Sequence, residues 1–223
     1  MFERERTDVA EACHLLAREG LVIGTAGNVS ALAGDQGVAI SPTGAVLAEV
    51  APEDVTVVEL DGQVVAGDLK PTSELDLHLG VYRRYDAGAV VHTHAPMATA
   101  LSCILDELPC IHYQMLLLGG PVPVAPYATF GTQELATAVL DALEGHSAAL
   151  MANHGAIVHA PDMAGAIERS LLLEWACTVY WRAAAIGSPK ALDEAQRQAV
   201  VAAALERGYG TTRPTNRDPE EAG

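Results

Sequence analysis

Residues 89–94, with the sequence Ala-Val-Val-His-Thr-His, form an apolar run that ends in two histidines. Such a run is typical of a buried strand. Because side chains alternate along a strand, His92 and His94 would project from one face and Thr93 from the other, with the histidine Cα atoms about 6.6 Å apart. Two imidazoles on this base can bind one metal ion at roughly 2.0–2.1 Å, although they can equally be ordinary polar residues at a strand end.

A third histidine, His154, follows another apolar run at residues 148–151 and precedes Gly155. Glycine allows a sharp turn of the backbone, so this imidazole is well placed to reach inward; taken alone, a surface or capping role is the ordinary interpretation. Three histidines that leave a coordination position open are typical of a catalytic zinc site. The remaining histidines show no such arrangement and are expected to be structural or surface residues, namely His14, His78, His112, His146 and His159.

The rest of the chain alternates helical and strand patterns. A helix is expected from the capping box Asp8-x-x-Glu11 to Gly20, followed by antiparallel strands over residues 21–67 with a tight hairpin at Asp61-Gly62. Further helices are expected from Ser73 and at residues 96–105, 132–143, 162–185 and 193–207, with strands at 148–151 and 156–159. This order predicts one α/β domain over residues 1–210, with a central, mainly antiparallel sheet flanked by helices, and a mobile polar tail over residues 211–223.

The composition describes a globular chain with a strong negative charge. At 223 residues it is long enough to bury roughly 70% of its unfolded surface, and half of its residues are hydrophobic. The formal net charge of −16 would repel a phosphate backbone or an anionic membrane, so neither nucleic acid nor membrane partners are expected. An anionic small molecule would need local hydrogen-bond donors, which are to be sought in the loops.

The N-terminus and the cysteines indicate the compartment. Residues 1–6 carry charges of both signs, and no apolar segment of signal-peptide type follows them. No stretch approaches the ~18 apolar residues of a membrane span. The cysteines lack Cys-x-x-Cys spacing, so neither a zinc ribbon nor a redox pair is indicated, and reduced thiols are expected. We therefore expect a cytoplasmic protein.

Taken together, the motifs resemble the class II aldolase and adducin family, most closely its L-fuculose-1-phosphate aldolase branch. The matching motifs occur in family order at residues 24–30 (GTAGNVS), 41–44 (SPTG), 71–74 (PTSE), 92–94 (HTH), 111–113 (IHY), 125–132 (APYATFGT) and 154–155 (HG). The resemblance implies a three-layer α/β fold around an antiparallel sheet. It also implies a ring-like homotetramer with active sites at subunit interfaces and a small phosphorylated sugar as substrate.

The resemblance assigns roles to individual residues. The implied zinc ligands, with Mn²⁺ or Co²⁺ as alternatives to Zn²⁺, are His92, His94 and His154. Glu74 resembles the general base and can also occupy the metal when substrate is absent. The residues that resemble a phosphate cradle are Asn28, Thr43, Gly44, Thr72 and Ser73. Tyr113 from a neighbouring subunit and Tyr209 resemble residues that act on the aldehyde portion, and Phe130 resembles one that shapes the same pocket.

Simpler interpretations stay open for these residues. Glu74 also fits a first-turn glutamate favoured by the helix dipole, the loops around Asn28 and Thr43 also fit plain turns, and both tyrosines also fit packing residues. The sequence departs from the family pattern at Thr72, where a serine is usual, and at Leu75, where a tryptophan is usual. The second difference leaves the identity of the sugar open.

The chemistry of aldol cleavage explains why a metal is expected. Cleavage leaves a carbanion beside a carbonyl, which needs a lysine Schiff base or a Lewis-acid metal as an electron sink. Neither Lys70 nor Lys190 lies in a segment that suggests a desolvated amine, so a metal is favoured. Glu74 would then move the proton, with a pKa that is expected to be raised by partial burial.

The expected reaction is the reversible cleavage of L-fuculose 1-phosphate or a 5-deoxypentulose 1-phosphate to dihydroxyacetone phosphate and a short aldehyde. A second hypothesis keeps the metal and changes the reaction to that of an L-ribulose-5-phosphate 4-epimerase or a methylthioribulose-1-phosphate dehydratase. The epimerase branch is expected to have an acidic residue near residues 110–113, and none is present. A third is a non-catalytic, adducin-like module, which would have lost the histidines that remain here.

Overall fold

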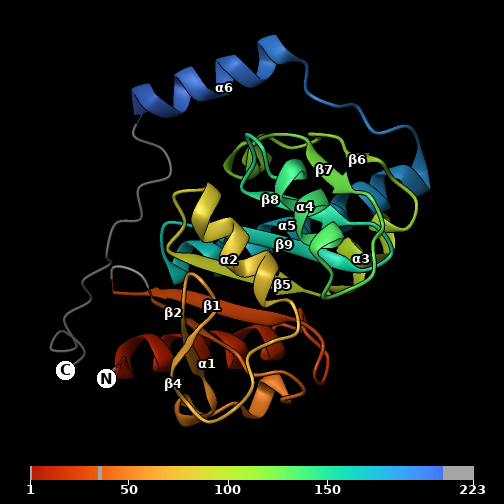
Figure 1. Cartoon of the computed structure of the whole chain (residues 1–223). Coiled ribbons are helices and arrows are strands. Elements are labelled where there is room, and N and C mark those ends of the chain that lie inside the picture. The colour runs from red at the N-terminus through yellow and green to blue at the C-terminus, as the bar shows by residue number, and fades with distance from the viewer. Residues whose placement is uncertain (1, 35–36, 208–223) are drawn as a thin grey trace, which may run out of the picture.

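A computed structural model describes residues 2–34 and 37–207 (Figure 1). Its centre is a nine-stranded sheet in the order β4-β3-β2-β1-β5-β9-β8-β7-β6. Within this described part, all neighbouring strands pair antiparallel except β7 and β8, which are parallel. The strands are β1 (Asn28–Ala33), β2 (Gly37–Ile40), β3 (Thr56–Glu59), β4 (Val64–Ala66), β5 (Ala89–Thr93), β6 (Glu107–Leu108), β7 (Val122–Ala125), β8 (Ala148–Met151) and β9 (Gly155–Ala160). The predicted mainly antiparallel sheet is confirmed.

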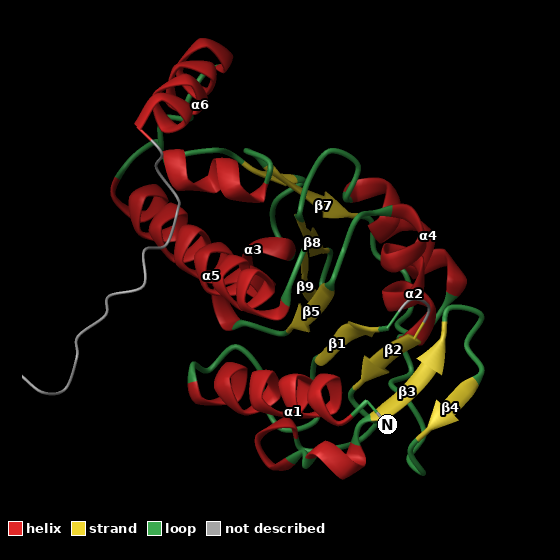
Figure 2. Cartoon of the chain, turned by 90° about the vertical axis from the view of Figure 1, so that its left-hand side faces the viewer, coloured by secondary structure: helices red, strands yellow, loops and turns green. Residues whose placement is uncertain are grey.

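Helices cover both faces of this sheet. The described helices are α1 (Glu3–Arg18), α2 (Leu75–Arg84), α3 (Pro96–Ser102), α4 (Gln133–Ala142), α5 (Met163–Ile186) and α6 (Glu194–Arg207), with 3₁₀ turns η1 (Leu47–Glu49), η2 (Pro52–Asp54) and η3 (Tyr113–Leu118); all but α6 pack against the sheet or the loops beside it. Figure 2 shows α1, α3 and α5 on one face and α2 and α4 on the other. Along β5, Ala89 and Val91 pack into the larger core and Val90 into the smaller one, as the alternation of strand side chains requires. The three-layer α/β fold is thus observed.

The first helix begins earlier than the capping-box pattern predicts. It starts at Glu3, so Asp8 lies inside the helix and not at its N-cap. Residues 3–7 include no glycine or proline, and Glu3 and Glu5 place negative charge in the first turn, where the helix dipole favours it. Asp8 forms an exposed ion pair with Arg4 one turn before it. The predicted start at Asp8 is therefore wrong.

Two regions show how far local patterns extend. The hairpin predicted at Asp61-Gly62 is present between β3 and β4, and Gly62 has a φ of 94°. In contrast, β6, η3 and β7 were not expected. A proline, Pro123, lies within β7 and argues against a strand because it cannot donate to the ladder. Pro123 pairs with Glu107 of the two-residue β6, and the amide of the next residue, Val124, donates to Asp106 O at 3.1 Å.

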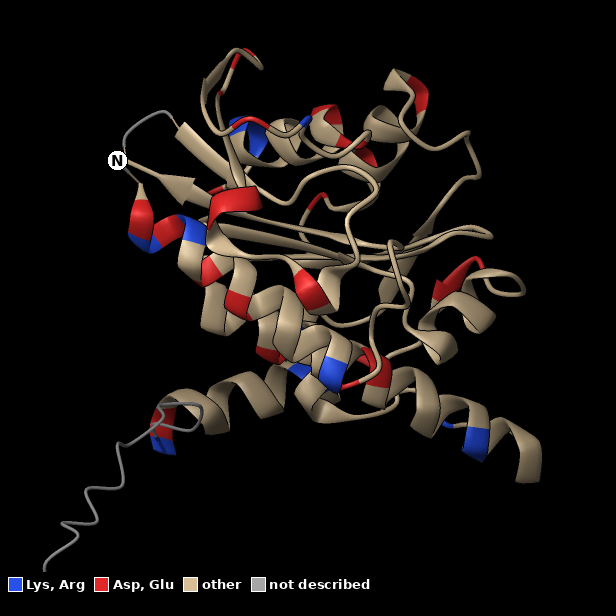
Figure 3. Ribbon diagram, turned by 90° about the horizontal axis from the view of Figure 1, so that it is seen from below, with Lys and Arg blue, Asp and Glu red and all other residues tan. Residues whose placement is uncertain are grey.

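The surface reflects the negative charge of the chain. Figure 3 shows that charged residues lie mostly on helices and loops, while the strands that cross the middle of the molecule are largely free of them. Helix α6 contacts η3 and has no buried residue.

No helix among residues 2–34 and 37–207 is long and apolar enough to cross a membrane. Tyr209 and the predicted tail over residues 211–223 lie outside the described residues.

Candidate active site

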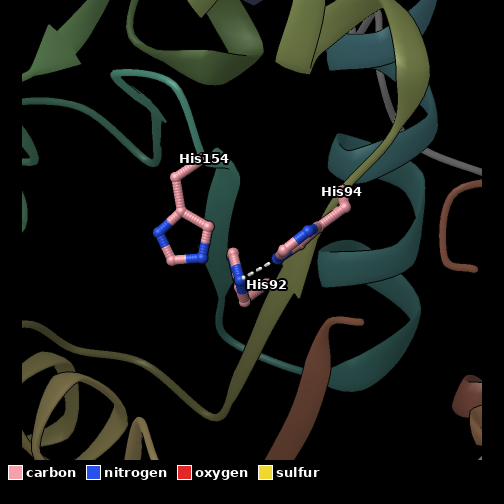
Figure 4. A group of neighbouring side chains, drawn as sticks. All are labelled: His92, His94 and His154. Atoms are coloured by element: carbon pink, nitrogen blue, oxygen red, sulfur yellow. Dashed lines mark hydrogen bonds between the residues drawn. The ribbon is translucent and has the colours of Figure 1, made fainter. Parts of the chain in front are cut away.

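The first two histidines lie at the end of β5, the central strand of the sheet. His92 pairs with Asn28 on β1 and with Ile157 on β9, and its side chain is fully buried. Its Nδ1 lies 2.9 Å from the carbonyl oxygen of Ala156. Because a carbonyl only accepts, Nδ1 carries the proton and Nε2 keeps a free lone pair. His94 Nε2 lies 3.0 Å from His92 Nε2 (Figure 4).

His154 reaches the same point from the turn between β8 and β9. Its ring centroid is 4.9 Å from that of His92 and 4.9 Å from that of His94, and the three candidate ligand atoms lie within 4.8 Å of one another. The left-handed residue of this turn is Asn153, with a φ of 55°, and not Gly155. Gly155 serves close packing instead, because a Cβ there would lie 2.3 Å from the carbonyl oxygen of Thr93.

Glu74 faces the three imidazoles from the N-cap position of α2. It is buried, with Oε2 3.2 Å from His92 Nε2 and Oε1 3.6 Å from His154 Nε2. Oε1 has no hydrogen-bond partner among the described residues. Leaving a buried polar atom without a partner costs free energy. A cation or a hydrogen-bond donor of a ligand would supply the missing partner of Oε1.

The electrostatics of the site favour an ionised Glu74 and neutral forms of His94 and His154. Burial raises the pKa of Glu74, but the charge of His92 and the hydrogen bond from Asn28 lower it by more, so its pKa lies below the usual value. The expectation of a raised pKa is therefore wrong. Burial, with further lowering by His92, brings the pKa of His94 to about 4 and also lowers the pKa of His154. Neutral imidazoles are the form that binds metal.

Asn28 and His78 form a second layer behind Glu74. Asn28 Nδ2 donates to Glu74 Oε2 at 2.9 Å, and His78 Nε2 lies 2.5 Å from Asn28 Oδ1. Burial, together with the charge of His92, lowers the pKa of His78 to about 3, so it is neutral. His78 was expected to be structural or at the surface. Its spacing of four from Glu74, which places both on one helix face, was the signal that could have revealed it.

A cavity of about 450 Å³ opens beside these groups. Sequence-predicted site residues that line it are Asn28, Thr43, Gly44, Thr72, Ser73, Glu74, His94, Phe130 and His154. It is also lined by Tyr127 and Asn153, which were not predicted. Tyr127 belongs to the APYATFGT motif, so its motif membership was the available signal. Segments far apart in the sequence thus meet around one space.

The polar side of the cavity is formed by two loops that are joined through their backbones. Thr43 N donates to Lys70 O at 3.0 Å, and Thr72 N donates to Ser41 O at 3.1 Å. These two amides are therefore not available to bind an anion. Among described residues, the amides of Gly44 and Ser73 have no such acceptor. They remain as donors, together with the threonine and serine hydroxyls.

Tyr113 lies outside the cavity of its own chain. It begins η3, and its ring centroid is 4.5 Å from that of His112, which in turn packs 4.8 Å from Trp175. It is not among the described residues that line the cavity of its own chain. Phe130, in contrast, lines the cavity with a largely exposed ring.

Comparison with known proteins places this site in a family. A family model described as the Class II Aldolase and Adducin N-terminal domain matches residues 7–181. The chain belongs to the class II aldolase and adducin family. All three histidines and Glu74 lie inside the matched region.

The chain aligns over most of its length with relatives that are class II aldolases by name. The 5-deoxy-D-ribulose 1-phosphate aldolase of Bacillus thuringiensis serovar kurstaki is 39% identical over 212 residues, or 94% of this chain and 99% of the relative. The L-fuculose phosphate aldolase of Escherichia coli K12 is 37% identical over 183 residues, or 81% and 84%. Among solved structures, an L-fuculose 1-phosphate aldolase matches with a TM-score of 0.86 at 33% identity, covering 90% of this chain and 95% of that one.

Proposed function

We propose that this chain is a metal-dependent aldolase that reversibly cleaves a ketose 1-phosphate to dihydroxyacetone phosphate and a short aldehyde. The candidate substrates are L-fuculose 1-phosphate and 5-deoxypentulose 1-phosphates, in line with the names of the relatives. The observation that carries the proposal is that His92, His94 and His154 meet opposite Glu74 Oε1, which has no hydrogen-bond partner among the described residues, and that His94, His154 and Glu74 line one cavity.

The donor set fits a divalent metal, with zinc as the first choice and Mn²⁺ or Co²⁺ as alternatives. Three imidazoles leave a coordination position open, as catalytic zinc sites do. The hydrogen bond from His92 to Ala156 O is the kind of outer contact that fixes the orientation of a metal-binding imidazole. When bound, such an ion supplies a Lewis acid that withdraws electron density from the substrate carbonyl.

Glu74 is proposed as the general base. Its carboxylate is held at Oε2 by Asn28, and its lowered pKa keeps it ionised and able to accept a proton. Burial restricts its motion and keeps bulk water from the proton that it receives. Without substrate, the same Oε1 is proposed as an additional metal ligand, which its distance of 3.6 Å from His154 Nε2 supports.

The phosphate is proposed to bind at the Thr43-Gly44 and Thr72-Ser73 loops. No lysine or arginine of the described residues lines the cavity, so binding would rely on neutral donors and on the N-terminus of α2, whose dipole favours an anion. Asn28 is also assigned to this region, although its side chain is already bonded to Glu74 and His78. Phe130 is proposed to shape the other wall.

We also propose a homotetramer with active sites at subunit interfaces, located in the cytoplasm. Tyr113 lies away from the cavity of its own chain and is half exposed near the exposed aromatic ring of Trp175, which suits a residue that serves a neighbouring subunit. The role proposed for Tyr209 rests on the resemblance alone. The free cysteines suit a reducing compartment. Light scattering of the purified protein tests the tetramer.

A condensation assay tests the proposed reaction. Dihydroxyacetone phosphate is incubated with zinc-loaded protein and with acetaldehyde, lactaldehyde or glycolaldehyde in turn, and the ketose 1-phosphate products are identified. Formation of a carbon–carbon bond with at least one aldehyde is expected. Epimerisation of L-ribulose 5-phosphate or dehydration of methylthioribulose 1-phosphate without any condensation would replace the proposal. A metal-free, inactive protein would point to an adducin-like module.

A further inference from the structure

A continuous line of hydrogen bonds runs from Glu74 into the interior between β1 and α2. Asn28 Nδ2 lies 2.9 Å from Glu74 Oε2, and Asn28 Oδ1 lies 2.5 Å from His78 Nε2. His78 Nδ1 lies 2.7 Å from Ser30 Oγ, which lies 2.8 Å from the hydroxyl of Tyr82. His78 and Ser30 are fully buried, so bulk solvent does not compete with these contacts.

The chemistry of the groups fixes the direction of each hydrogen bond. An ionised carboxylate only accepts, so the nitrogen of Asn28 faces Glu74 and its oxygen faces His78. His78 then donates from Nε2, which in a neutral ring leaves Nδ1 to accept from the Ser30 hydroxyl. Ser30 in turn accepts from Tyr82. Every donor therefore points toward Glu74, and hydrogen bonds aligned in this way polarise one another.

The local sequence explains how this line is built. Glu74, His78 and Tyr82 are spaced by four at the start of α2 and along it, so they lie on one face about 6 Å apart. Asn28 and Ser30 are spaced by two on β1 and share a face with a repeat of about 6.8 Å. Because these repeats are nearly equal, the two strand side chains fit between the three helix side chains.

We propose that His78 is a positioning residue that acts through Asn28 to hold Glu74 Oε2, leaving Oε1 as the oxygen that exchanges a proton with the substrate. This inference rests on the proposed aldolase function. Without His78, the amide of Asn28 could turn over and present its oxygen to the carboxylate, which would repel it. His78 prevents this because its Nε2–H needs an oxygen opposite it. Oε1 has no partner among the described residues and lies on the side of His154.

The tautomer of His78 gives a test that does not depend on activity. Nitrogen-15 NMR of the zinc-loaded, full-length protein, with the signal assigned by its loss in His78→Gln, reports which ring nitrogen carries the proton. A protonated Nε2 and an unprotonated Nδ1 are expected. The opposite tautomer would reverse the line of hydrogen bonds and overturn the proposal.

The second test measures exchange of the proton of dihydroxyacetone phosphate with solvent. His78→Phe is expected to lower kcat for exchange by about 10- to 100-fold, the usual cost of losing an outer contact, with KM and zinc content unchanged. His78→Gln is expected to restore most of the rate, because its amide can still donate to Asn28 Oδ1. Tyr82→Phe removes only the last donor and is expected to have a smaller effect than His78→Phe.

A matched control separates positioning from stability. His159 is a half-buried histidine on β9 whose ring stacks on Tyr85, so His159→Phe is expected to alter stability and leave exchange unchanged. Exchange at the wild-type rate in His78→Phe, or equal losses in the Phe and Gln variants, would refute the proposal while leaving the aldolase function intact. If His78→Phe does not fold, the exchange rate of Tyr82→Phe and the His78 tautomer measured by NMR still test the proposal. Absence of exchange in the wild-type protein would end both proposals.

Discussion

Hydrogen bonds hold different parts of the chain at the two ends of the cavity. At the metal end the side chains themselves are held, His92 by the carbonyl oxygen of Ala156 and Glu74 by Asn28. At the other end, where we propose that the phosphate binds and which we call the phosphate end, the side chains of Thr43 and Ser73 are exposed, and the backbones of the two loops are joined by hydrogen bonds. A side-chain substitution should therefore be far more damaging at the first end than at the second.

The largest effect is expected from loss of the metal. Prolonged treatment with a strong chelator should reduce condensation to background, and zinc should restore it. His92→Ala should lower activity by more than about a thousandfold, because Lewis-acid stabilisation contributes several kcal/mol. Metal content and condensation rate are measured together, with His159→Ala as a control that should keep both. Full activity in metal-free protein would contradict the proposed role of this end.

The next largest effect is expected from Glu74→Gln. The amide keeps the shape of the side chain but cannot accept the proton as a carboxylate does, so proton exchange on dihydroxyacetone phosphate should fall by about 10²- to 10⁴-fold. Zinc content should be retained. Asp76→Asn, an exposed carboxylate two residues further along α2, is the matched control and should exchange normally. A normal exchange rate in Glu74→Gln would show that another group is the base.

The free energy of unfolding should depend on pH through His78, at the metal end of the cavity. Burial and the charge of His92 lower the pKa of His78 to about 3 from 6.5, so between these values the unfolded chain takes up a proton that the folded chain lacks. The free energy of unfolding should therefore fall as pH decreases below 6.5, by up to about 1.4 kcal/mol per pH unit for this proton. His78→Gln should reduce that slope. Urea unfolding at pH 7 and 5 measures it, and equal slopes would contradict the assignment.

The smallest effect is expected at the phosphate end. Ser73→Ala removes one exposed hydroxyl, and a neutral hydrogen bond contributes about 0.5–1.5 kcal/mol. The KM for dihydroxyacetone phosphate should therefore rise by roughly 3- to 10-fold with kcat unchanged. Thr137→Ala, on the exposed surface of α4, should alter neither. A loss as large as that of Glu74→Gln would erase the difference between the two ends.

Local patterns in the sequence predicted the elements whose signal is local. The alternation around His92 and the turn signal at Asp61-Gly62 both correspond to observed structure, and the antiparallel sheet followed from the order of the elements. The parallel pairing of β7 could not be predicted, because it depends on partners distant in sequence and its proline argues against a strand. Nor could the pKa of Glu74 be predicted, since its direction depends on which groups surround the carboxyl and not on burial alone.

The histidine site was predictable only in part. The spacing of His92 and His94 is informative by itself, whereas the placement of His154 depended on a fold that brings β5 and β9 together. The hydrogen-bond partners of His78 could not be predicted, because His78 lies on α2 while Asn28 and Ser30 lie on β1, far away in the sequence. Residues that act through neighbours leave a weaker pattern than residues that touch the ligand.

The chain is acidic, and the lining of its cavity includes no lysine or arginine among the described residues, so under the proposed function we expect the metal ion to bind before the sugar phosphate. Before a divalent cation arrives, the ionised Glu74 and the overall field both oppose a doubly charged sugar phosphate. Afterwards the local sign is reversed, so the affinities for cation and sugar phosphate are coupled. We therefore expect the metal-free chain to bind sugar phosphates weakly, and moderate salt, by screening the overall field, to speed their binding to the metal-loaded chain.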